Sequence, residues 1–321
     1  MRNKGITYII VTWNNEKEIE NCLSSIAENC TMNYQVVVVD NCSSDNTVSI
    51  VEKQFPDVEL IASKENLGFA GGNNLALKYV KYDYICYLNP DTVLIEDIAT
   101  PSVEFLKEHP ETGLVCCRLL NPNHTIQKSC YSFLTPLKAF ANILHINEFF
   151  SMVLPNKYFP TFYTGTEPII IDWAYGAEMI LSTEDAFKLN GFSTDYYMYT
   201  EDMDICKRVY ESLHKNVVLL ASKALIHLGG ASEKQNVNYK KQLLVARNSA
   251  KFAKKFYGNH SDKKLLKSMW YAYSIRSILL KLFYFKNDRK EQIIKSSTQV
   301  DTFTAVLREC EQNEKKHKFL F

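Results

Sequence analysis

Residues 35–41 read QVVVVDN, an unbroken valine run that ends in an acid and an amide. Residues 6–13 read ITYIIVTW, a second run rich in β-branched side chains. Strands that are apolar on both sides fit a sheet that helices cover on both faces. Between the two runs, residues 16–27 repeat isoleucine and leucine at helical spacing. These stretches therefore predict the start of a mainly parallel α/β sheet.

The alternation of strand and helix signals continues along the chain. Further strands are expected at residues 58–62, 84–88, 114–119 and 217–220, with strand character over 168–182. Further helices are expected at residues 45–55, 71–80, 98–108, 185–189 and 201–212, and from 247 onward. Residues 121–167 have no clear period, so they form either an inserted substrate-contacting region or a long packed connection.

The composition is that of an ordinary globular protein. Its 321 residues are 46% hydrophobic and 23% charged, which suggests about two domains. We expect a domain over residues 1–245 and a basic helical region over residues 246–321. The sequence contains no apolar run long enough to cross a bilayer, no signal peptide and no disulfide-type spacing among its nine cysteines, so we expect a cytoplasmic location.

The net charge of +1 hides an asymmetry between the two regions. Residues 1–245 contain 20 Lys and Arg against 29 Asp and Glu, whereas residues 246–321 contain 17 against 7. A basic tail on an acidic body suits an anionic membrane surface or nucleic acid, or is simply a solvated helical face. The tail carries no recognisable nucleic-acid motif, so we expect no nucleic-acid partner.

One stretch of this tail, residues 263–286, has an imperfect amphipathic pattern. Its apolar face comprises Leu265, Met269, Tyr273, Leu280 and Phe283, and its basic face comprises Lys263, Lys267 and Lys281. The apolar stripe fits a membrane interface, the domain over residues 1–245 or a second subunit of a homodimer. The sequence favours none of the three.

Polar residues gather where the predicted strands end, which is the edge at which open α/β sheets bind ligands. The turn after the first strand contains no glycine, which excludes a dinucleotide-binding fingerprint, and no phosphate-binding P-loop is present. A bound nucleotide would therefore need a divalent metal, Mg²⁺ or Mn²⁺, to neutralise its diphosphate. Asp91 is the natural oxygen ligand, although Asn-Pro-Asp is also a common turn.

Taken together, these motifs resemble family 2 glycosyltransferases, and among them the bacterial rhamnosyltransferase-like enzymes. The amino-terminal matches are Thr12-Trp13-Asn14, Val39-Asp40-Asn41, Asn66-Leu67-Gly68-Phe69-Ala70 and Leu88-Asn89-Pro90-Asp91. The later matches are Trp173-Ala174-Tyr175-Gly176-Ala177, Gly191-Phe192, Glu201-Asp202-x-Asp204 and His227-x-Gly229-Gly230-x-Ser232. Each motif alone is weakly specific for the family. Eight motifs in the family's order over about residues 6–235 are together a strong indication of the resemblance.

The resemblance implies a GT-A fold that binds a nucleotide-sugar with a divalent metal and transfers the sugar with inversion. The positions expected to bind the donor are Thr12, Asn14, Asp40, Asn66, Gly68, Asn89 and Asp91. Asp91 matches the second acid of the metal-binding Asp-x-Asp, and Asn89 stands where the first acid would be. His227 matches a histidine that can complete the metal site.

The resemblance also makes Asp202 the expected general base, because inverting transfer needs one carboxylate to take the acceptor's proton. Glu201, Trp173, Tyr175 and Gly176 are expected to line the substrate pocket. The alternative is that the acids at 201 and 202 only complement a helix dipole and that the aromatic residues belong to the core.

The function implied is a metal-dependent glycosyltransferase of bacterial surface polysaccharide or O-antigen synthesis, peripheral at the inner face of the cell membrane. Its expected substrates are dTDP-rhamnose as donor and a glycan or lipid-linked glycan as acceptor. One alternative is the same chemistry with a UDP-hexose donor. Another is a non-catalytic nucleotide-sugar binding or scaffold protein, against which the presence of Asp91, Asp202 and His227 argues.

Overall fold

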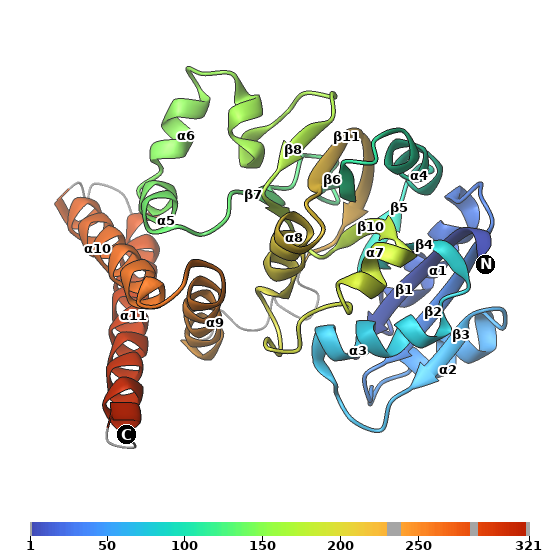
Figure 1. Ribbon diagram of the computed structural model, residues 1–321, viewed down its shortest axis with the longest axis horizontal. Helices are drawn as coiled ribbons and strands as arrows, with labels where there is room; N and C mark the ends of the chain where they lie inside the picture. Colours follow the sequence, from blue (N-terminus) through green and yellow to red (C-terminus); the bar gives the residue numbers. More distant parts are fainter. Residues whose placement is uncertain (1, 230–238, 283–287, 319–321) are drawn as a thin grey trace. The chain divides into compact units, whose positions relative to one another are not determined.

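The computed structural model describes residues 2–229, 239–282 and 288–318, with the backbone alone at 156, 288–290 and 313–318. The chain forms two compact units (Figure 1). The first, called here the sheet unit, comprises residues 1–132 and 160–234, and the second, called the helical unit, comprises 133–159 and 235–321. The expected boundary after residue 245 lies inside helix α9 (Tyr239–Tyr257), and the helical unit also includes residues 133–159.

The sheet unit is built on a nine-stranded mixed sheet of order β3-β2-β1-β4-β10-β6-β11-β5, with β8 beside β11. Its strands are β1 (Asn3–Thr12), β2 (Tyr34–Asp40), β3 (Glu59–Ala62), β4 (Tyr82–Leu88), β5 (Thr92–Leu94), β6 (Thr112–Leu120), β8 (Ile169–Ile171), β10 (Glu178–Ser182) and β11 (Asn216–His227). The pairs β1–β2, β1–β4, β2–β3 and β6–β11 are parallel. The expected mixed, mainly parallel sheet is confirmed.

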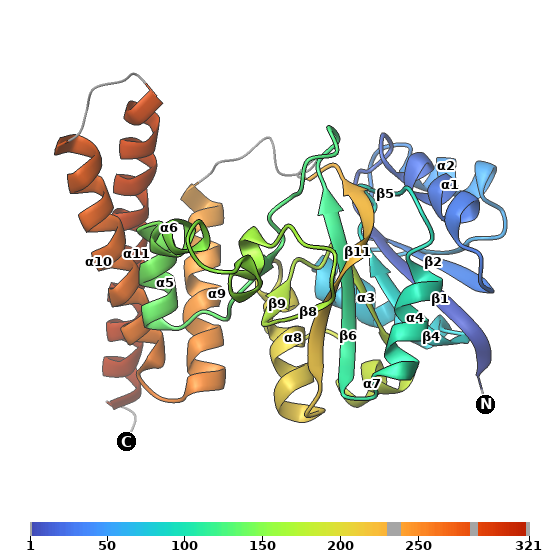
Figure 2. The same ribbon diagram turned by 90° about the horizontal axis from the view of Figure 1, so that it is seen from above.

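Helices cover both faces of this sheet (Figure 2). They are α1 (Ile19–Asn29), α2 (Thr47–Gln54), α3 (Gly68–Ala76), α4 (Ala99–Glu108), α7 (Thr183–Lys188) and α8 (Glu201–Ser212), with short 3-10 turns η1 (Leu77–Tyr79) and η3 (Pro160–Phe162). Alternate residues of β1, among them Ile6, Tyr8 and Ile10, are buried with α1 and α4. A small second sheet pairs β7 (Cys130–Tyr131) with β9 (Trp173–Ala174).

Two elements differ from the sequence prediction in ways that shape the site. Helix α3 begins at Gly68 rather than Gly71, and a Cβ on Gly72 would lie 2.7 Å from Val11 Cγ1. Gly72 therefore serves close packing of helix on strand rather than approach to a ligand. Strand β11 extends to His227 instead of ending at Leu220, with a register shift between Leu220 and Ala224.

A buried glutamate lies in the middle of the sheet, in β10. Glu178 is 1% exposed, and its Oε2 accepts a 2.7 Å hydrogen bond from the Cys117 backbone N–H. Among the described residues, its Oε1 has no hydrogen-bond partner. Burial raises the pKa of this carboxyl to about 8, so it holds its proton at neutral pH.

We expect Glu178→Gln to flatten the pH dependence of stability. The folded protein keeps this proton up to about pH 8, whereas the unfolded chain loses it near pH 4.5, so the free energy of unfolding falls as pH rises between these values. The steepest slope from this one group is about 1.4 kcal/mol per pH unit. Urea unfolding at pH 5 and pH 8.5 should show this fall in wild type and its loss in the variant. Glu184→Gln, at an exposed site, should keep the wild-type slope, and equal slopes in all three proteins would contradict the assignment.

The helical unit consists of α5 (Pro136–Ile143), α6 (Ile146–Ser151), the 3-10 turn η2 (Asn156–Tyr158), α9, α10 (Ser261–Leu282) and α11 (Asp288–Lys318). Leu265 is buried against Ala139 of α5, and the Tyr273 ring stacks on Phe303 of α11 at 5.7 Å. The expected stripe of Leu265, Met269 and Tyr273 therefore packs inside this unit, while Phe283 lies outside the described residues. Among the described residues, no helix is both long and apolar enough to cross a membrane.

Candidate active site

The ends of β1 and β2 form a polar cradle around one carboxylate. The Thr12 hydroxyl donates to Asp40 Oδ1 at 3.1 Å, and the Ser43 backbone N–H donates to Asp40 Oδ2 at 2.9 Å. The Ser43 hydroxyl also donates to Asp40. Thr12 and Asp40 are both buried, so the carboxylate is fixed with its acceptor atoms at the carboxyl edge of the sheet.

The neighbouring loops join this cradle through side-chain amides. Asn14, in the left-handed region at φ 57°, accepts a 2.8 Å hydrogen bond from the Ser44 N–H. Asn66 Oδ1 accepts from the Gly68 N–H at 2.9 Å, and Asn41 Nδ2 donates to the Gly68 carbonyl at 3.0 Å. Gly68 has φ 71°, and a Cβ there would meet the Tyr197 carbonyl at 2.6 Å. The structure thus brings Thr12, Asn14, Asp40, Asn66 and Gly68 together.

Asp91 and His227 meet because the short strand β5 pairs with the end of β11. β5, which directly follows Asp91, runs antiparallel to the end of β11, and Thr92 lies opposite His227. His227 Nε2 is 3.4 Å from Asp91 Oδ1, and both side chains are largely buried. The Leu228 N–H also donates to the Asp91 carbonyl at 2.9 Å. The extension of β11 beyond Leu220 is what makes this meeting possible.

Gln127 fixes which nitrogen of His227 carries the proton. Gln127 Nε2 lies 3.3 Å from the His227 carbonyl, which can only accept, so this atom must be the amide nitrogen. Gln127 Oε1 is then the atom 2.7 Å from His227 Nδ1, and an amide oxygen can only accept. Neutral His227 therefore has its proton on Nδ1 and its Nε2 lone pair toward Asp91.

The facing acceptors fit a divalent cation. A lone pair on Nε2 and a carboxylate oxygen 3.4 Å apart repel each other unless a cation or a proton lies between them. A histidine that donates its second N–H to an oxygen is the usual arrangement of a metal ligand. Among the described residues, no three His, Cys, Asp or Glu side chains gather as a complete metal site. The two present could hold an ion whose other ligands come from a substrate phosphate and water.

The two-residue segment Gly176–Ala177 connects Asp202 to the loop that carries Asn89 and Asp91. The Asn89 N–H donates to the Ala177 carbonyl at 2.9 Å. On the preceding residue, the Gly176 N–H donates to Asp202 Oδ2 at 3.4 Å. A Cβ on Gly176 would lie 3.4 Å from the Asp202 Cβ. The structure thus brings the loop that carries Asn89 and Asp91 and the start of α8 onto the same backbone segment.

The start of α8 holds carboxyl groups in a desolvated place. Burial raises the pKa of Asp202 to about 6, although N–H donors from Met203 and Gly176 oppose the rise. Burial and the Asp202 charge raise the pKa of Glu201 further, and Glu201 Oε2 has no hydrogen-bond partner among the described residues. A neutral Glu201 beside an ionised Asp202 is the state these shifts favour near pH 7.

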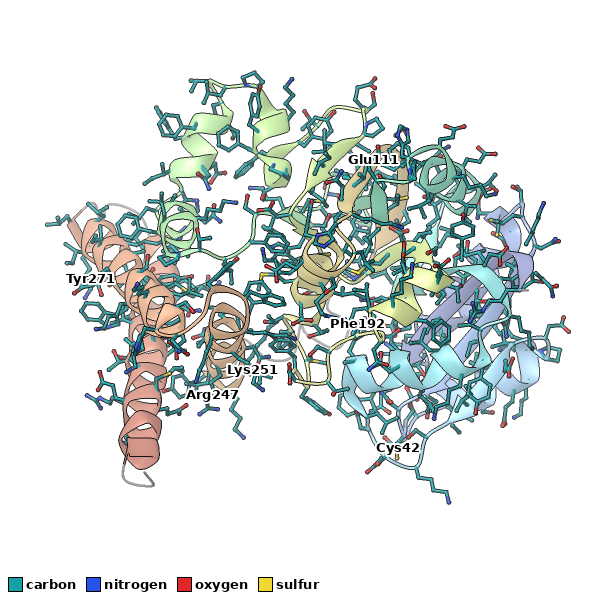
Figure 3. The ribbon with its side chains drawn as sticks, in the orientation of Figure 1. Cys42, Glu111, Phe192, Arg247, Lys251 and Tyr271 are labelled. Carbon is teal, nitrogen blue, oxygen red and sulfur yellow. The ribbon has the colours of Figure 1, made fainter. Side chains whose placement is uncertain are left out.

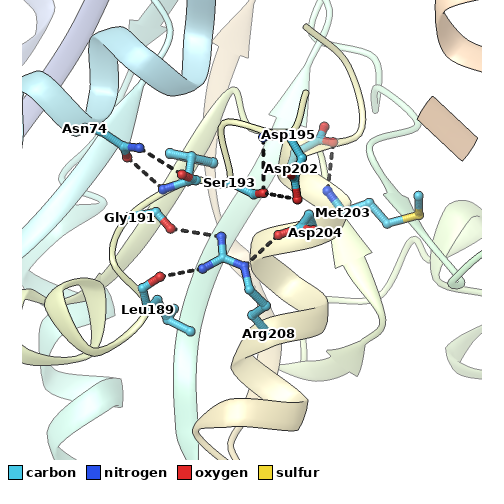
Figure 4. A network of polar contacts seen from close by, with 10 residues as sticks. Asn74, Leu189, Gly191, Ser193, Asp195, Asp202, Met203, Asp204 and Arg208 are labelled. Atoms are coloured by element: carbon cyan, nitrogen blue, oxygen red, sulfur yellow. Dashed lines mark hydrogen bonds and ion pairs between the residues drawn. The ribbon is translucent and has the colours of Figure 1, made fainter. Parts of the chain in front are cut away.

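The backbone before α8 is strained and firmly held. Tyr199 and Thr200 have φ of 68° and 82°, a conformation that costs a non-glycine residue about 1–3 kcal/mol. Arg208 donates to Asp204 Oδ1 and to the Leu189 carbonyl, each at 2.6 Å, and so ties α8 to the loop that precedes it (Figure 4). This network fixes the position of Asp202 on its helix.

Three aromatic rings form a shelf next to these acids. The Tyr131 and Trp173 rings stack at 5.1 Å, and the Tyr131 and Tyr175 hydroxyls are 3.1 Å apart. Burial is the main cause that raises the pKa of Tyr131, and Tyr175 and then the charge of Asp202 add to the rise. Tyr175 is partly exposed, so the shelf is not simply core.

Sequence reasoning missed Tyr131 and Gln127. Both come from residues 121–167, which have no periodicity, and they reach the site through the β7–β9 pair and the end of β11. Gly230 and Ser232, which the motif around His227 includes, lie outside the described residues.

Comparison with known proteins shows which families and folds the chain is similar to. Residues 7–150 match the family model described as Glycosyl transferase family 2. The chain is 26% identical over 210 residues to the rhamnosyltransferase WbbL of Escherichia coli K12, covering 63% of this chain and 75% of WbbL. It is 29% identical over 114 residues to the poly-beta-1,6-N-acetyl-D-glucosamine synthase of Staphylococcus aureus strain COL, covering 35% of this chain but only 28% of the synthase.

Solved structures show the same fold at low identity. The mannosyltransferase PcManGT of Pyrobaculum calidifontis, solved with GDP-Man and Mn²⁺, superposes with a TM-score of 0.59 at 16% identity, covering 94% of this chain and 86% of PcManGT. TarS of S. aureus superposes with a TM-score of 0.51 at 19% identity, covering 91% of this chain and 47% of TarS. The chain carries a family 2 glycosyltransferase domain with the GT-A fold, and it is a glycosyltransferase.

Proposed function

We propose that the chain is an inverting glycosyltransferase that uses a divalent metal and a nucleotide-sugar donor. The observation that carries the proposal is the Gly176–Ala177 segment, which bonds to the Asn89 backbone on one residue and to the Asp202 carboxylate on the other. This connection supports a reaction centre that would lie between the loop of Asp91, the proposed metal ligand, and Asp202, the proposed base. Inverting transfer requires both in one place.

Asp91 and His227 would hold the metal, with Gln127 orienting the imidazole. When bound, Mg²⁺ or Mn²⁺ would supply positive charge to the diphosphate that leaves the sugar. Thr12, Asn14, Asp40, Asn66 and Gly68 would bind the nucleoside at the end of β1 and β2.

Asp202 would act as the general base. The acceptor hydroxyl oxygen bonds to the anomeric carbon as the bond from that carbon to the diphosphate breaks, and the hydroxyl proton passes to Asp202. A carboxylate with a pKa of about 6 is a stronger base than an ordinary aspartate and is still ionised at pH 7. Neutral Glu201 would avoid a second charge in the pocket, and Gly176 would leave room beside the carboxylate.

For the donor, we propose dTDP-rhamnose, with a UDP-hexose as the alternative. The similarity to a rhamnosyltransferase supports the first choice. For the acceptor, we propose a glycan or lipid-linked glycan of a bacterial surface polysaccharide, with Trp173, Tyr175 and Tyr131 stacking on a sugar face. A non-catalytic binding role would leave the raised pKa of Asp202 without a purpose.

A screen of nucleotide-sugars by thermal denaturation tests the donor. At about 100 Kd of ligand, stabilisation should reach about 2.7 kcal/mol, which raises the melting temperature by a few degrees. We expect this rise with dTDP-rhamnose and Mn²⁺ and none when EDTA replaces Mn²⁺. A rise with UDP-glucose alone would select the alternative donor, and equal rises with and without metal would contradict the metal requirement.

A further inference from the structure

A hollow of about 860 Å³ opens in the sheet unit, at the edge of the sheet opposite the polar cradle of β1 and β2. We call it the amino-edge hollow, because β1 and β4 begin there and the antiparallel strand β10 ends there. The loop between α1 and β2 and the last turns of α4 complete its lining. In Figure 2, α7 and the start of β1 lie at this edge. The volume is within the range of small-molecule binding sites.

The amino-edge hollow is separate from the candidate active site. β1 runs from Lys4 in the hollow to Thr12 in the polar cradle, a length of strand that spans about 26 Å. Figure 3 shows the same separation on labelled side chains, since Glu111, directly before β6, and Cys42, shortly after β2, lie on opposite sides of the sheet unit. A ligand in the hollow would therefore not contact the donor site.

A β-bulge shapes one wall of the hollow. The register of β1 against β4 shifts between Asn3 and Ile6, where β1 contains one residue more than β4. Bulges are rare between parallel strands, and next to functional sites they change the direction of a side chain. This bulge comprises Lys4 and Gly5, which both line the hollow. A Cβ on Gly5 would collide with the Asn33 carbonyl oxygen, so only glycine fits at this position.

Three cationic side chains line the hollow without a counter-ion. Among the described residues, the side chains of Arg2, Lys4 and Lys107 form no hydrogen bond and no ion pair. The Arg2 guanidinium lies over the Phe187 ring at 4.8 Å, and Lys107 Nζ lies over the Tyr84 ring at 5.8 Å. These ring contacts position two of the charges but do not neutralise them.

The acids of the lining leave most of this charge uncompensated. Glu184 is paired with Lys188 at 2.7 Å, and Asp83 forms no ion pair within the part of the chain that the structure describes. Three cations against one unpaired carboxylate give an excess of about two positive charges. A phosphate monoester carries about −1.5 to −2 at pH 7, whereas a phosphodiester carries a single charge. The charge of the hollow therefore favours a monoester.

The uncharged polar groups of the lining suit a sugar better than a nucleoside. The side chains of Thr31, Asn33 and Ser182 offer hydroxyl and amide groups that can exchange hydrogen bonds with sugar hydroxyls. Tyr84 is the one aromatic ring among the described lining residues, and Lys107 lies over its face. The hollow thus lacks the free aromatic face on which a base would stack.

We propose that the amino-edge hollow is a second binding site, for the phosphate monoester of a sugar. Arg2, Lys4 and Lys107 bind the phosphate, and the polar side chains of the lining bind the sugar hydroxyls. Binding needs no divalent metal, because the three cations themselves supply the positive charge. The site goes beyond the proposed transfer reaction and does not depend on it.

Titration calorimetry of the full chain with glucose 1-phosphate, in EDTA, tests the proposal. We expect saturable binding to wild type. The double variant Lys4→Gln/Lys107→Gln should lower the affinity about tenfold or more, because it removes two charged contacts to the phosphate. The matched control is Lys53→Gln, since Lys53 is an exposed lysine of the sheet unit in α2, outside the hollow. This control should bind as wild type does.

Two further ligands separate the sugar from the phosphate. Inorganic phosphate should bind about tenfold more weakly than glucose 1-phosphate, and methyl glucoside should not bind measurably. Equal affinity for inorganic phosphate and glucose 1-phosphate would overturn the assignment to a sugar phosphate. Absence of saturable binding up to about 10 mM would overturn the site itself. So would unchanged affinity in Lys4→Gln/Lys107→Gln.

The variant Asp91→Asn distinguishes this proposal from the proposed transfer reaction. We expect it to bind glucose 1-phosphate in EDTA as wild type does, even though its metal-dependent donor binding is weakened. Loss of glucose 1-phosphate binding in Asp91→Asn would place the ligand at the donor site and overturn the second site. Failure of donor binding with intact glucose 1-phosphate binding would count against the proposed function alone.

Discussion

Replacing Asp202 with asparagine should lower kcat by about 10²–10⁴-fold, the usual contribution of a general base, and leave donor affinity within about twofold of wild type. The amide is nearly isosteric and can still accept from the Met203 N–H, which bonds Asp202 Oδ1 at 2.8 Å. It cannot take a proton from the acceptor hydroxyl. Transfer rates at saturating donor, together with nucleotide titration, separate the two effects.

The matched control is Asp185→Asn, which also removes an acid from the first turn of a helix. Asp185 lies in α7 and pairs with Lys215 Nζ at 2.6 Å, away from the Gly176–Ala177 segment. We expect this variant to lose stability and keep its kcat. If Asp202→Asn behaved in the same way, the acid at 202 would serve only the helix dipole.

The wild-type rate should also fall on the acid side of pH 6. Because burial raises the pKa of Asp202 to about 6, the fraction of active base halves near that pH and drops tenfold for each unit below it. A residual rate in Asp202→Asn should lack this acid limb. The loss of rate in Asp202→Asn and the fall of the wild-type rate below pH 6 would then have the same cause, which is that residue 202 cannot take the acceptor's proton.

Replacing Asp91 with asparagine should weaken metal-dependent donor binding by about 100-fold or more. Loss of groups that merely orient metal ligands typically costs about 10–100-fold, and removal of a carboxylate ligand should cost at least as much. Titration calorimetry with the nucleoside diphosphate and Mn²⁺ measures the loss. In EDTA, wild type and variant should bind equally weakly.

Asp83→Asn provides the control, since Asp83 lies near the start of β4, whereas Asp91 follows the other end of that strand. Its donor affinity should match wild type with and without Mn²⁺. Unchanged Mn²⁺ dependence in Asp91→Asn would assign the metal to other ligands. A drop in metal-free affinity of the same size would assign Asp91 to nucleotide contact instead.

The central strands were predictable because their signals are local. The apolar runs of β1 and β2 predict strands, and the acids at the start of α8 predict the start of a helix. Polar residues at the strand ends indicate the edge of the sheet at which a ligand binds. β11 was underestimated because Ser222 and Lys223 interrupt its apolar run at the register shift. No local sequence pattern indicates that β11 continues beyond this shift and places His227 beside Asp91.

The rest of the site depends on contacts between residues far apart in the chain. Tyr131 reaches the site because it pairs with Trp173, 42 positions later. α5 packs against α10, more than 120 residues away in the chain. The local sequence of α5 does not indicate which helix it contacts. Glu178 could not be predicted as buried and neutral, since an acid in a strand is usually on the solvent side.

The Gly176–Ala177 segment has a consequence for how this enzyme can change. In the proposed mechanism, its two peptide units would set the spacing between the leaving-group side, reached through the Asn89 backbone, and the attacking side, reached through the Asp202 carboxylate. A sugar of different thickness would therefore need an insertion or deletion here, which would displace both sides at once. We therefore expect a change of donor preference to arise by substitutions around the Gly176–Ala177 segment, with the length of the segment unchanged.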